Sequence, residues 1–140
     1  MARRAADRVS GASRIPARPL NRPSLQLAIE INRAARDPEE WFDDPDDLER
    51  VESALAAIDD MNEPVEAAAT LAYRVTRAQG LAEGNKRTGL LLARWLLDRN
   101  GIDGAQFLPP DDRELADLLV KAASGVDVES QVVGLLTRRA

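Results

Sequence analysis

A short loop that leads into an apolar helix carries the residues of this sequence that are best suited to chemistry. The loop ends at Gly84, and the predicted helix begins with Asn85, Lys86 and Arg87 and continues to Arg99. The N-terminus of a helix presents unpaired backbone N–H groups and a partial positive charge, which together attract anions. Glycine lets the backbone approach a ligand closely, and an asparagine side chain can cap a helix. The pattern therefore predicts an anion site at Gly84 and Asn85.

The charged residues around this helix start favour a phosphate ligand. Two cations at a helix N-terminus oppose the helix dipole by about 0.3–1 kcal/mol each, so Lys86 and Arg87 are better explained if they face a bound polyphosphate. Glu83 would then supply a carboxylate oxygen for Mg2+ beside that phosphate. The alternative is that the two basic side chains are merely solvated, and the residue types alone leave it open.

The composition limits the chemistry and the partners of the protein. The chain of 140 residues contains neither histidine nor cysteine, which leaves carboxylates, Lys, Arg, hydroxyl groups or an oxygen-held metal for any catalysis. A net charge of −5 argues against a specific nucleic-acid partner. No apolar run approaches the roughly 20 residues of a membrane span, and the basic N-terminus lacks the apolar stretch of a secretory signal. We therefore expect a cytoplasmic protein without a membrane partner.

The hydrophobic periodicity predicts an all-α fold, a compact bundle of about six helices. Residues 1–23 are rich in Pro and Arg without any period, so we expect a flexible arm there, followed by one helical domain over residues 24–140. Apolar side chains surround almost the whole circumference of residues 85–99, which is typical of a buried central helix. The predicted helices cover residues 25–36, 46–60, 62–79, 85–99, 111–123 and 128–138, with a loop over residues 102–110.

Two other charged groups need an interpretation. Residues 43–47 include four aspartates but lack the spacing of a calcium-binding loop, so we interpret them as the solvated start of a helix. Arg74 and Arg77 lie near the end of the predicted helix that precedes the loop. They could reach a phosphate, or they could simply complement the negative end of the helix dipole.

The residues from Glu83 to Thr88, Glu-Gly-Asn-Lys-Arg-Thr, resemble the signature of a known family. They are similar to the C-terminal part of the Fic/Doc loop, His-x-Phe-x-Asp/Glu-Gly/Ala-Asn-Lys/Gly-Arg, which stands at the start of a central helix. The lysine in Asn-Lys-Arg resembles the Doc (death-on-curing) branch. Residues 96–101 also resemble the end of that helix in Doc proteins, and residues 114–118 and 122–125 resemble the helix and the break that follow it. Residues 48–58 resemble the helix before the loop, so that the resemblance covers roughly residues 46–137.

The resemblance implies a small helical bundle that binds ATP or another nucleoside triphosphate with Mg2+. Members of the family transfer AMP, another nucleotide moiety or phosphate to a protein hydroxyl group. Doc proteins are toxins that are paired with a small antitoxin protein, and the Doc type acts on a translation elongation factor. By position, Glu83 would bind the metal, and the nucleotide phosphates would be bound by Gly84, Asn85, Lys86, Arg87 and Thr88.

The sequence departs from the family pattern at its catalytic position. The histidine of the signature falls on Gln79, and its phenylalanine falls on Leu81. A glutamine amide forms hydrogen bonds but does not titrate near neutral pH, and the loss of a general base typically costs about 10²–10⁴-fold in rate. The protein is then a non-catalytic nucleotide- or partner-binding pseudoenzyme, a slow or altered transferase, or a toxin silenced by engineering. The inhibitory Ser/Thr-x-x-x-Glu-Gly/Asn pattern of the family is not found, which favours a separate antitoxin.

Overall fold

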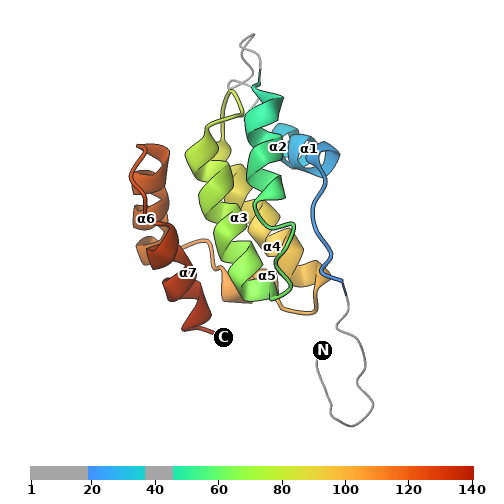
Figure 1. Ribbon diagram of the computed structural model, residues 1–140. Helices are drawn as coiled ribbons and strands as arrows, with labels where there is room; N and C mark the ends of the chain where they lie inside the picture. Colours follow the sequence, from blue (N-terminus) through green and yellow to red (C-terminus); the bar gives the residue numbers. More distant parts are fainter. Residues whose placement is uncertain (1–18, 37–45) are drawn as a thin grey trace.

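The part of the chain that the structure describes is entirely helical, which confirms the all-α prediction. The computed structural model describes residues 19–36 and 46–140, and no strand occurs in these ranges (Figure 1). The helices are α1 (Leu25–Ala35), α2 (Leu48–Ala56), α3 (Pro64–Ala78), α4 (Asn85–Arg99), α5 (Gly104–Phe107), α6 (Arg113–Ala123) and α7 (Glu129–Thr137). The four-residue helix α5 is the one element that the periodicity did not predict, because it is too short to show a period.

Helices α3 and α4 form the centre of the bundle together. Ten of the fifteen residues of α3 are buried, compared with seven of the fifteen residues of α4. The helix predicted over residues 85–99 is therefore central, but α3 lies beside it at the centre and contributes more of the core. The two helices approach closely because small residues line the contact: Ala72 is fully buried, and a methyl group on Gly89 would lie 2.9 Å from its carbonyl oxygen.

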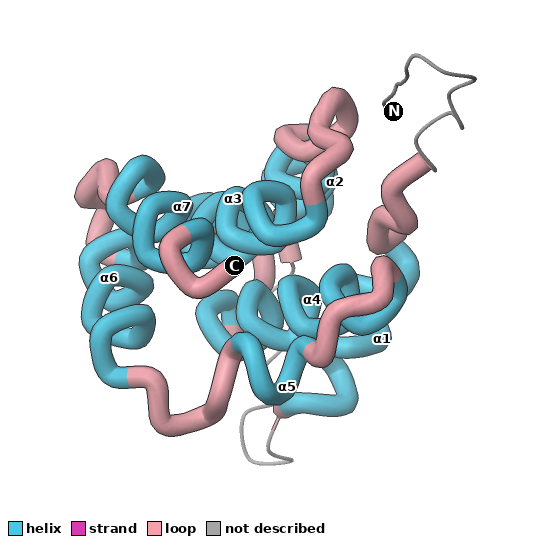
Figure 2. The backbone as a smooth tube through the Cα atoms, turned by 90° about the horizontal axis from the view of Figure 1, so that it is seen from below, coloured by secondary structure: helices cyan, strands magenta, loops and turns pink. Residues whose placement is uncertain are grey.

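The remaining helices pack around this pair in two layers. Seen along the bundle, α2, α3 and α7 lie on one side, α4 and α1 lie on the other, and α6 closes one flank (Figure 2). The loop between α3 and α4 is short, so the two helices run antiparallel as neighbours. None of the helices in residues 19–36 and 46–140 is long and apolar enough to cross a membrane.

Residues 19–23, the end of the predicted arm, lie against the bundle. Leu20 is buried, and Asn21 is tied to the C-terminal end of α4 by three hydrogen bonds. The Asn21 amide donates to Asn100 Oδ1 over 2.9 Å, and Asn21 Nδ2 donates to the Arg99 carbonyl over 2.9 Å. Asn100 Nδ2 donates in return to the Asn21 carbonyl. Residues 1–18 lie outside the described residues, so the flexible arm stays a prediction for them.

Most of the helices begin with a side-chain cap, but α4 and α7 do not. A Ser, Asp or Glu oxygen accepts a hydrogen bond from a first-turn amide at five helices, the capping residues being Ser24, Asp47, Glu63, Asp103 and Asp112. At α4 the capping position is taken by Gly84, and no side chain caps the helix. The N-terminal N–H groups of a helix need partners, so the start of α4 leaves such groups available to a ligand.

The cap of α6 gives a prediction about stability in acid. Burial opposes ionisation of Asp112, but hydrogen bonds from Arg139 and the Leu115 amide, with the Arg139 charge, lower its pKa below the ordinary value of 3.8. A lowered pKa in the folded state contributes stability above pH 3.8 that is lost as the pH falls through the folded pKa. We expect Asp112→Asn, which keeps a capping oxygen, to lower stability at pH 6 and to make it less sensitive to acid.

Urea unfolding of wild type, Asp112→Asn and Asp111→Asn between pH 2 and 6 measures this effect. Asp111 is an exposed neighbour, and its variant should keep the pH dependence of the wild type. An Asp112→Asn curve that falls in acid as steeply as the wild-type curve would contradict the assignment.

Candidate functional site

The loop between α3 and α4 is held in shape by the side chain of Asn85. Asn85 Oδ1 accepts a hydrogen bond from the Leu81 amide over 2.9 Å, and Asn85 Nδ2 donates to the Leu81 carbonyl over 2.9 Å. Both residues are buried. The prediction that the Asn85 side chain caps α4 is therefore wrong: Gly84 takes the capping position, and Asn85 points back and braces the loop.

Gly84 has a backbone conformation that favours glycine. Its φ of 74° lies in the left-handed region, and a Cβ atom would meet Asn32 Nδ2 at 3.3 Å. The Gly84 carbonyl accepts the first hydrogen bond of α4, from the Thr88 amide. Gly84 thus turns the chain into α4 without a side chain over the helix start.

A cavity of about 320 Å³ opens at this helix start. Its volume lies near the lower end of the range for small-molecule sites, about 300–1,000 Å³. It is therefore suited to the phosphate part of a nucleotide. The cavity is lined by Gln79, Ala82, Glu83, Gly84, Asn85, Lys86 and Arg87.

The two cations and the acid of the predicted site all line this cavity. Lys86 is exposed, and Arg87 also donates from Nη1 to the carbonyl oxygen of Ala35, the last residue of α1. A guanidinium has five N–H donors, so the bond to Ala35 does not by itself exclude a second acceptor. The structure thus places full positive charge and Glu83 around one uncapped helix N-terminus.

Thr88 does not reach the cavity. Its side chain is fully buried, and its Oγ1 accepts a hydrogen bond from Asn32 Nδ2 over 3.0 Å. The predicted phosphate-binding role of Thr88 is not supported by this placement. One turn into α4, Thr88 faces α1, and its contact joins the two helices.

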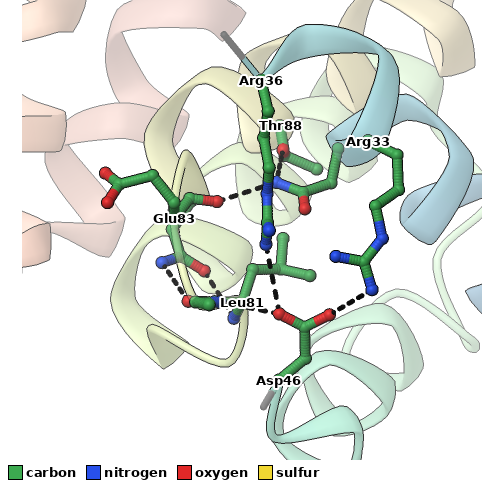
Figure 3. A network of polar contacts seen from close by, with 9 residues as sticks. Arg33, Arg36, Asp46, Leu81, Glu83 and Thr88 are labelled. Atoms are coloured by element: carbon green, nitrogen blue, oxygen red, sulfur yellow. Dashed lines mark hydrogen bonds and ion pairs between the residues drawn. The ribbon is translucent and has the colours of Figure 1, made fainter. Parts of the chain in front are cut away.

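Glu83 could bind a metal ion only if a bound ligand supplied further coordinating atoms. Its backbone carbonyl accepts from Asn32 Nδ2 over 2.8 Å, while its carboxylate points away from this network (Figure 3). Within residues 19–36 and 46–140, no three His, Cys, Asp or Glu side chains gather as a metal site. Mg2+ is commonly held by one or two carboxylates plus substrate phosphates and water. Glu83 beside an anion site fits that pattern.

Gln79 lies at the rim of the cavity, at the C-terminal end of α3. It is the one non-glycine residue with positive φ in the described ranges, at φ 51° and ψ 38°. Its Nε2 donates to the Thr76 carbonyl over 2.6 Å. The side chain is exposed, and it brings a polar but non-titrating group to the site.

Arg74 and Arg77 belong to a different surface. They line a depression of about 560 Å³ between α2 and α3. Arg74 forms an ion pair with Glu129 at 2.6 Å, and this hydrogen bond raises the pKa of Arg74 above its ordinary value against the effect of burial. Arg77 donates to the Tyr73 hydroxyl. Neither contact supports the alternative that Arg74 and Arg77 reach a phosphate at the N-terminus of α4.

The sequence did not indicate that Asp46 and Asn32, which lie outside the loop between α3 and α4, form hydrogen bonds with it. Asp46, interpreted as part of a solvated acidic run, has a side chain only 6% exposed and is bonded to Arg33, Arg36 and the Ala82 amide (Figure 3). The interpretation was wrong at this position, while residues 43–45 lie outside the described residues. Neither Asp46 nor Asn32 stands in a pattern that marks such contacts, because each partner in the loop lies 36 or more residues away.

Comparison with known proteins places these residues in a family. The sequence model of the Fic/DOC family matches residues 4–97, about two thirds of the chain. The match begins and ends earlier than the range of roughly 46–137 that the resemblance predicted, and it includes α1, α2, α3, the loop and most of α4. No curated protein matches the chain. Because the family match spans more than half of the sequence and contains every residue of the cavity, the chain belongs to the Fic/DOC family.

Proposed function

We propose that this protein binds a nucleoside triphosphate, such as ATP, with Mg2+ at the N-terminus of α4. The observation that carries the proposal is the uncapped start of α4 opening into a cavity lined by Lys86, Arg87 and Glu83. Helix N–H groups and the two cations would bind the phosphates. Glu83 would bind Mg2+, which neutralises phosphate charge when it is bound.

Gln79 limits the chemistry that a bound nucleotide can undergo. A protein of this family with a base at this position would transfer AMP, another nucleotide moiety or phosphate to a protein hydroxyl group. Gln79 can orient a hydroxyl group through hydrogen bonds, but it cannot accept its proton at neutral pH. We therefore propose a transferase scaffold whose transfer step is impaired or altered.

A second candidate is a non-catalytic module that binds a nucleotide or a partner protein. The observation that favours it is the same Gln79, together with the absence of any histidine from the chain. Measurable transfer of a nucleotide moiety or phosphate to a protein target would separate the two candidates, because only a transferase carries out this reaction.

The Asn-Lys-Arg triplet at Asn85 supports a place in the Doc branch, and we propose a cytoplasmic toxin–antitoxin role on that basis. The partners would be a small antitoxin protein and a hydroxyl-bearing target such as a translation factor. Co-expression with the product of an adjacent short reading frame tests this proposal. A stable complex supports the antitoxin, and a gene without such a neighbour argues against it.

Nucleotide binding should stabilise the folded protein. A ligand that binds only the native state adds about 2.7 kcal/mol at a concentration of 100 times its Kd, so we expect ATP with Mg2+ to raise the melting temperature by several degrees. Thermal unfolding with ATP, GTP, CTP and UTP, each with and without Mg2+, measures the shift. If no nucleoside triphosphate moves the melting temperature, the proposed site is wrong.

The Glu83→Gln variant tests the metal separately. We expect it to lose the Mg2+-dependent part of the shift and to retain a weaker shift from phosphate binding at the helix N-terminus. Glu114→Gln is a matched control, because Glu114 is an exposed acid in the first turn of α6. Equal Mg2+ dependence in both variants would remove Glu83 from the metal site.

A further inference from the structure

The carboxylate of Asp46 is bonded on both oxygens. Asp46 Oδ1 accepts from the Ala82 amide over 2.8 Å and from Arg36 Nη2 over 3.2 Å, and Asp46 Oδ2 accepts from Arg33 Nη2 over 3.0 Å. Arg33 lies in the last turn of α1, and Arg36 caps that helix. Asp46 thus connects the end of α1 to the loop between α3 and α4 (Figure 3).

Neighbouring contacts hold the same loop from two more directions. The Asp47 amide donates to the Gly80 carbonyl over 2.6 Å, two residues before the amide that Asp46 holds. A methyl group on Gly80 would lie 2.9 Å from the Asp47 carbonyl, so the two segments touch through their backbones. From the α1 side, Asn32 Nδ2 donates to the Glu83 carbonyl over 2.8 Å.

Because the Asp46–Arg36 ion pair is buried, a contribution to stability alone does not explain it. The side chains of Asp46 and Arg36 are 6% and 2% exposed, and a buried ion pair is often no more stabilising than well-packed apolar residues. An apolar side chain could not accept the hydrogen bond of the Ala82 amide. The charged pair therefore provides something packing cannot: a fixed orientation of the loop next to Glu83.

We propose that Asp46 is a positioning residue for the phosphate site. Held by Arg33 and Arg36, it fixes the Ala82 amide and thereby sets the direction in which Glu83 and the start of α4 face the ligand. The site is then preformed, so that binding does not need to order the loop, and preorganisation of this kind increases affinity. This inference rests on the proposed nucleotide site, and it adds that Asp46, two residues before α2, contributes to the affinity of that site.

The test uses the full chain and two readouts. Asp46→Asn keeps an acceptor oxygen but removes the charge between the arginines, and Asp47→Asn is the matched control because the Asp47 side chain is exposed and contacts Arg50 rather than the loop. Amide hydrogen exchange is measured at residues 81–83 in the unliganded protein, with Leu71 and Leu92 in the core as references. Affinity is measured by calorimetry with ATP and Mg2+.

We expect Asp46→Asn to speed exchange of the Ala82 amide about tenfold and to weaken ATP binding about tenfold, the size of a lost charge-assisted hydrogen bond. Core amides should not change, and Asp47→Asn should resemble the wild type in both readouts. If Asp46→Asn does not fold, the double variant Asp46→Asn/Arg36→Gln removes the unbalanced charge, and the same results are expected from it.

The other possible results overturn either the positioning role of Asp46 or the proposed function. Unchanged exchange at Ala82, or faster exchange in the loop with unchanged affinity, overturns the positioning role. Faster exchange that extends equally to Leu71 and Leu92 makes Asp46 a general stability residue and also overturns it. A wild-type protein that binds no nucleotide overturns the proposed function instead, and the exchange measurement still decides whether Asp46 fixes the loop.

Discussion

Replacement of Gln79 with histidine is expected to raise transfer to a protein hydroxyl group by about 10²–10⁴-fold, the usual contribution of a general base. The position suits the substitution, because Gln79 already lines the cavity with Glu83 and Lys86. Its left-handed backbone is one that histidine adopts more readily than most residues. A neutral imidazole at this place could accept the proton that a glutamine amide cannot.

The measurement is label transfer from ATP, GTP, CTP and UTP, carrying α- or γ-phosphate label, to proteins of a cell lysate. The activity of Gln79→His should rise as the pH passes the histidine pKa, ordinarily about 6.5, because the neutral ring is the base. Two variants serve as controls. Gln79→Asn keeps a non-titrating amide, and Gln131→His adds a histidine at an exposed position of α7. A Gln79→His protein that binds nucleotide yet stays inert with every label would contradict the inherited transfer chemistry.

Gly89→Ala should destabilise the protein by about 1–3 kcal/mol, which is typical of overpacking. The added methyl group would meet the Ala72 carbonyl at 2.9 Å and Thr76 Oγ1 at 3.1 Å. A carbonyl inside α3 cannot move without displacing that helix. The higher helix propensity of alanine, worth about 1 kcal/mol, opposes the loss but does not cancel it.

Gly134→Ala is the matched control, because it makes the same change inside α7. Its new methyl group would meet only the end of the flexible Arg138 side chain, at 3.3 Å. We expect this variant to be neutral or more stable by up to about 1 kcal/mol. Urea unfolding followed by circular dichroism compares the two. Equal stability of both variants would mean that α3 and α4 are not in the close contact described.

The sequence predicted the helices best where strong local signals mark their ends. The predicted range of residues 85–99 agrees with α4 at both ends, because Gly84 precedes it and Asn100 with Gly101 follows it. The cavity residues were found for the same reason: Glu83, Gly84, Lys86 and Arg87 are consecutive or nearly so, and a helix start brings them together by itself.

The predictions that the structure contradicts concern contacts that depend on the path of the folded chain. The direction of the Asn85 side chain depends on how the loop returns to Leu81, and the burial of Thr88 depends on Asn32, which lies 56 residues earlier. The acidic composition around Asp46 suggested solvation, whereas two arginines at the end of α1 bury its side chain. Local patterns carry no information about which of several charged residues meets a partner in the folded chain.

The hydrogen bonds that hold the two ends of α4 also bear on when this helix is fixed in place during synthesis. Asn32 and Asp46 hold its N-terminal side across 36 to 56 residues, and Asn21 holds its C-terminal end across 78 and 79 residues. Contacts so distant in sequence form late, after their loops have closed. Residues up to Asn100 must therefore have left the ribosome before both ends of α4 are held in place.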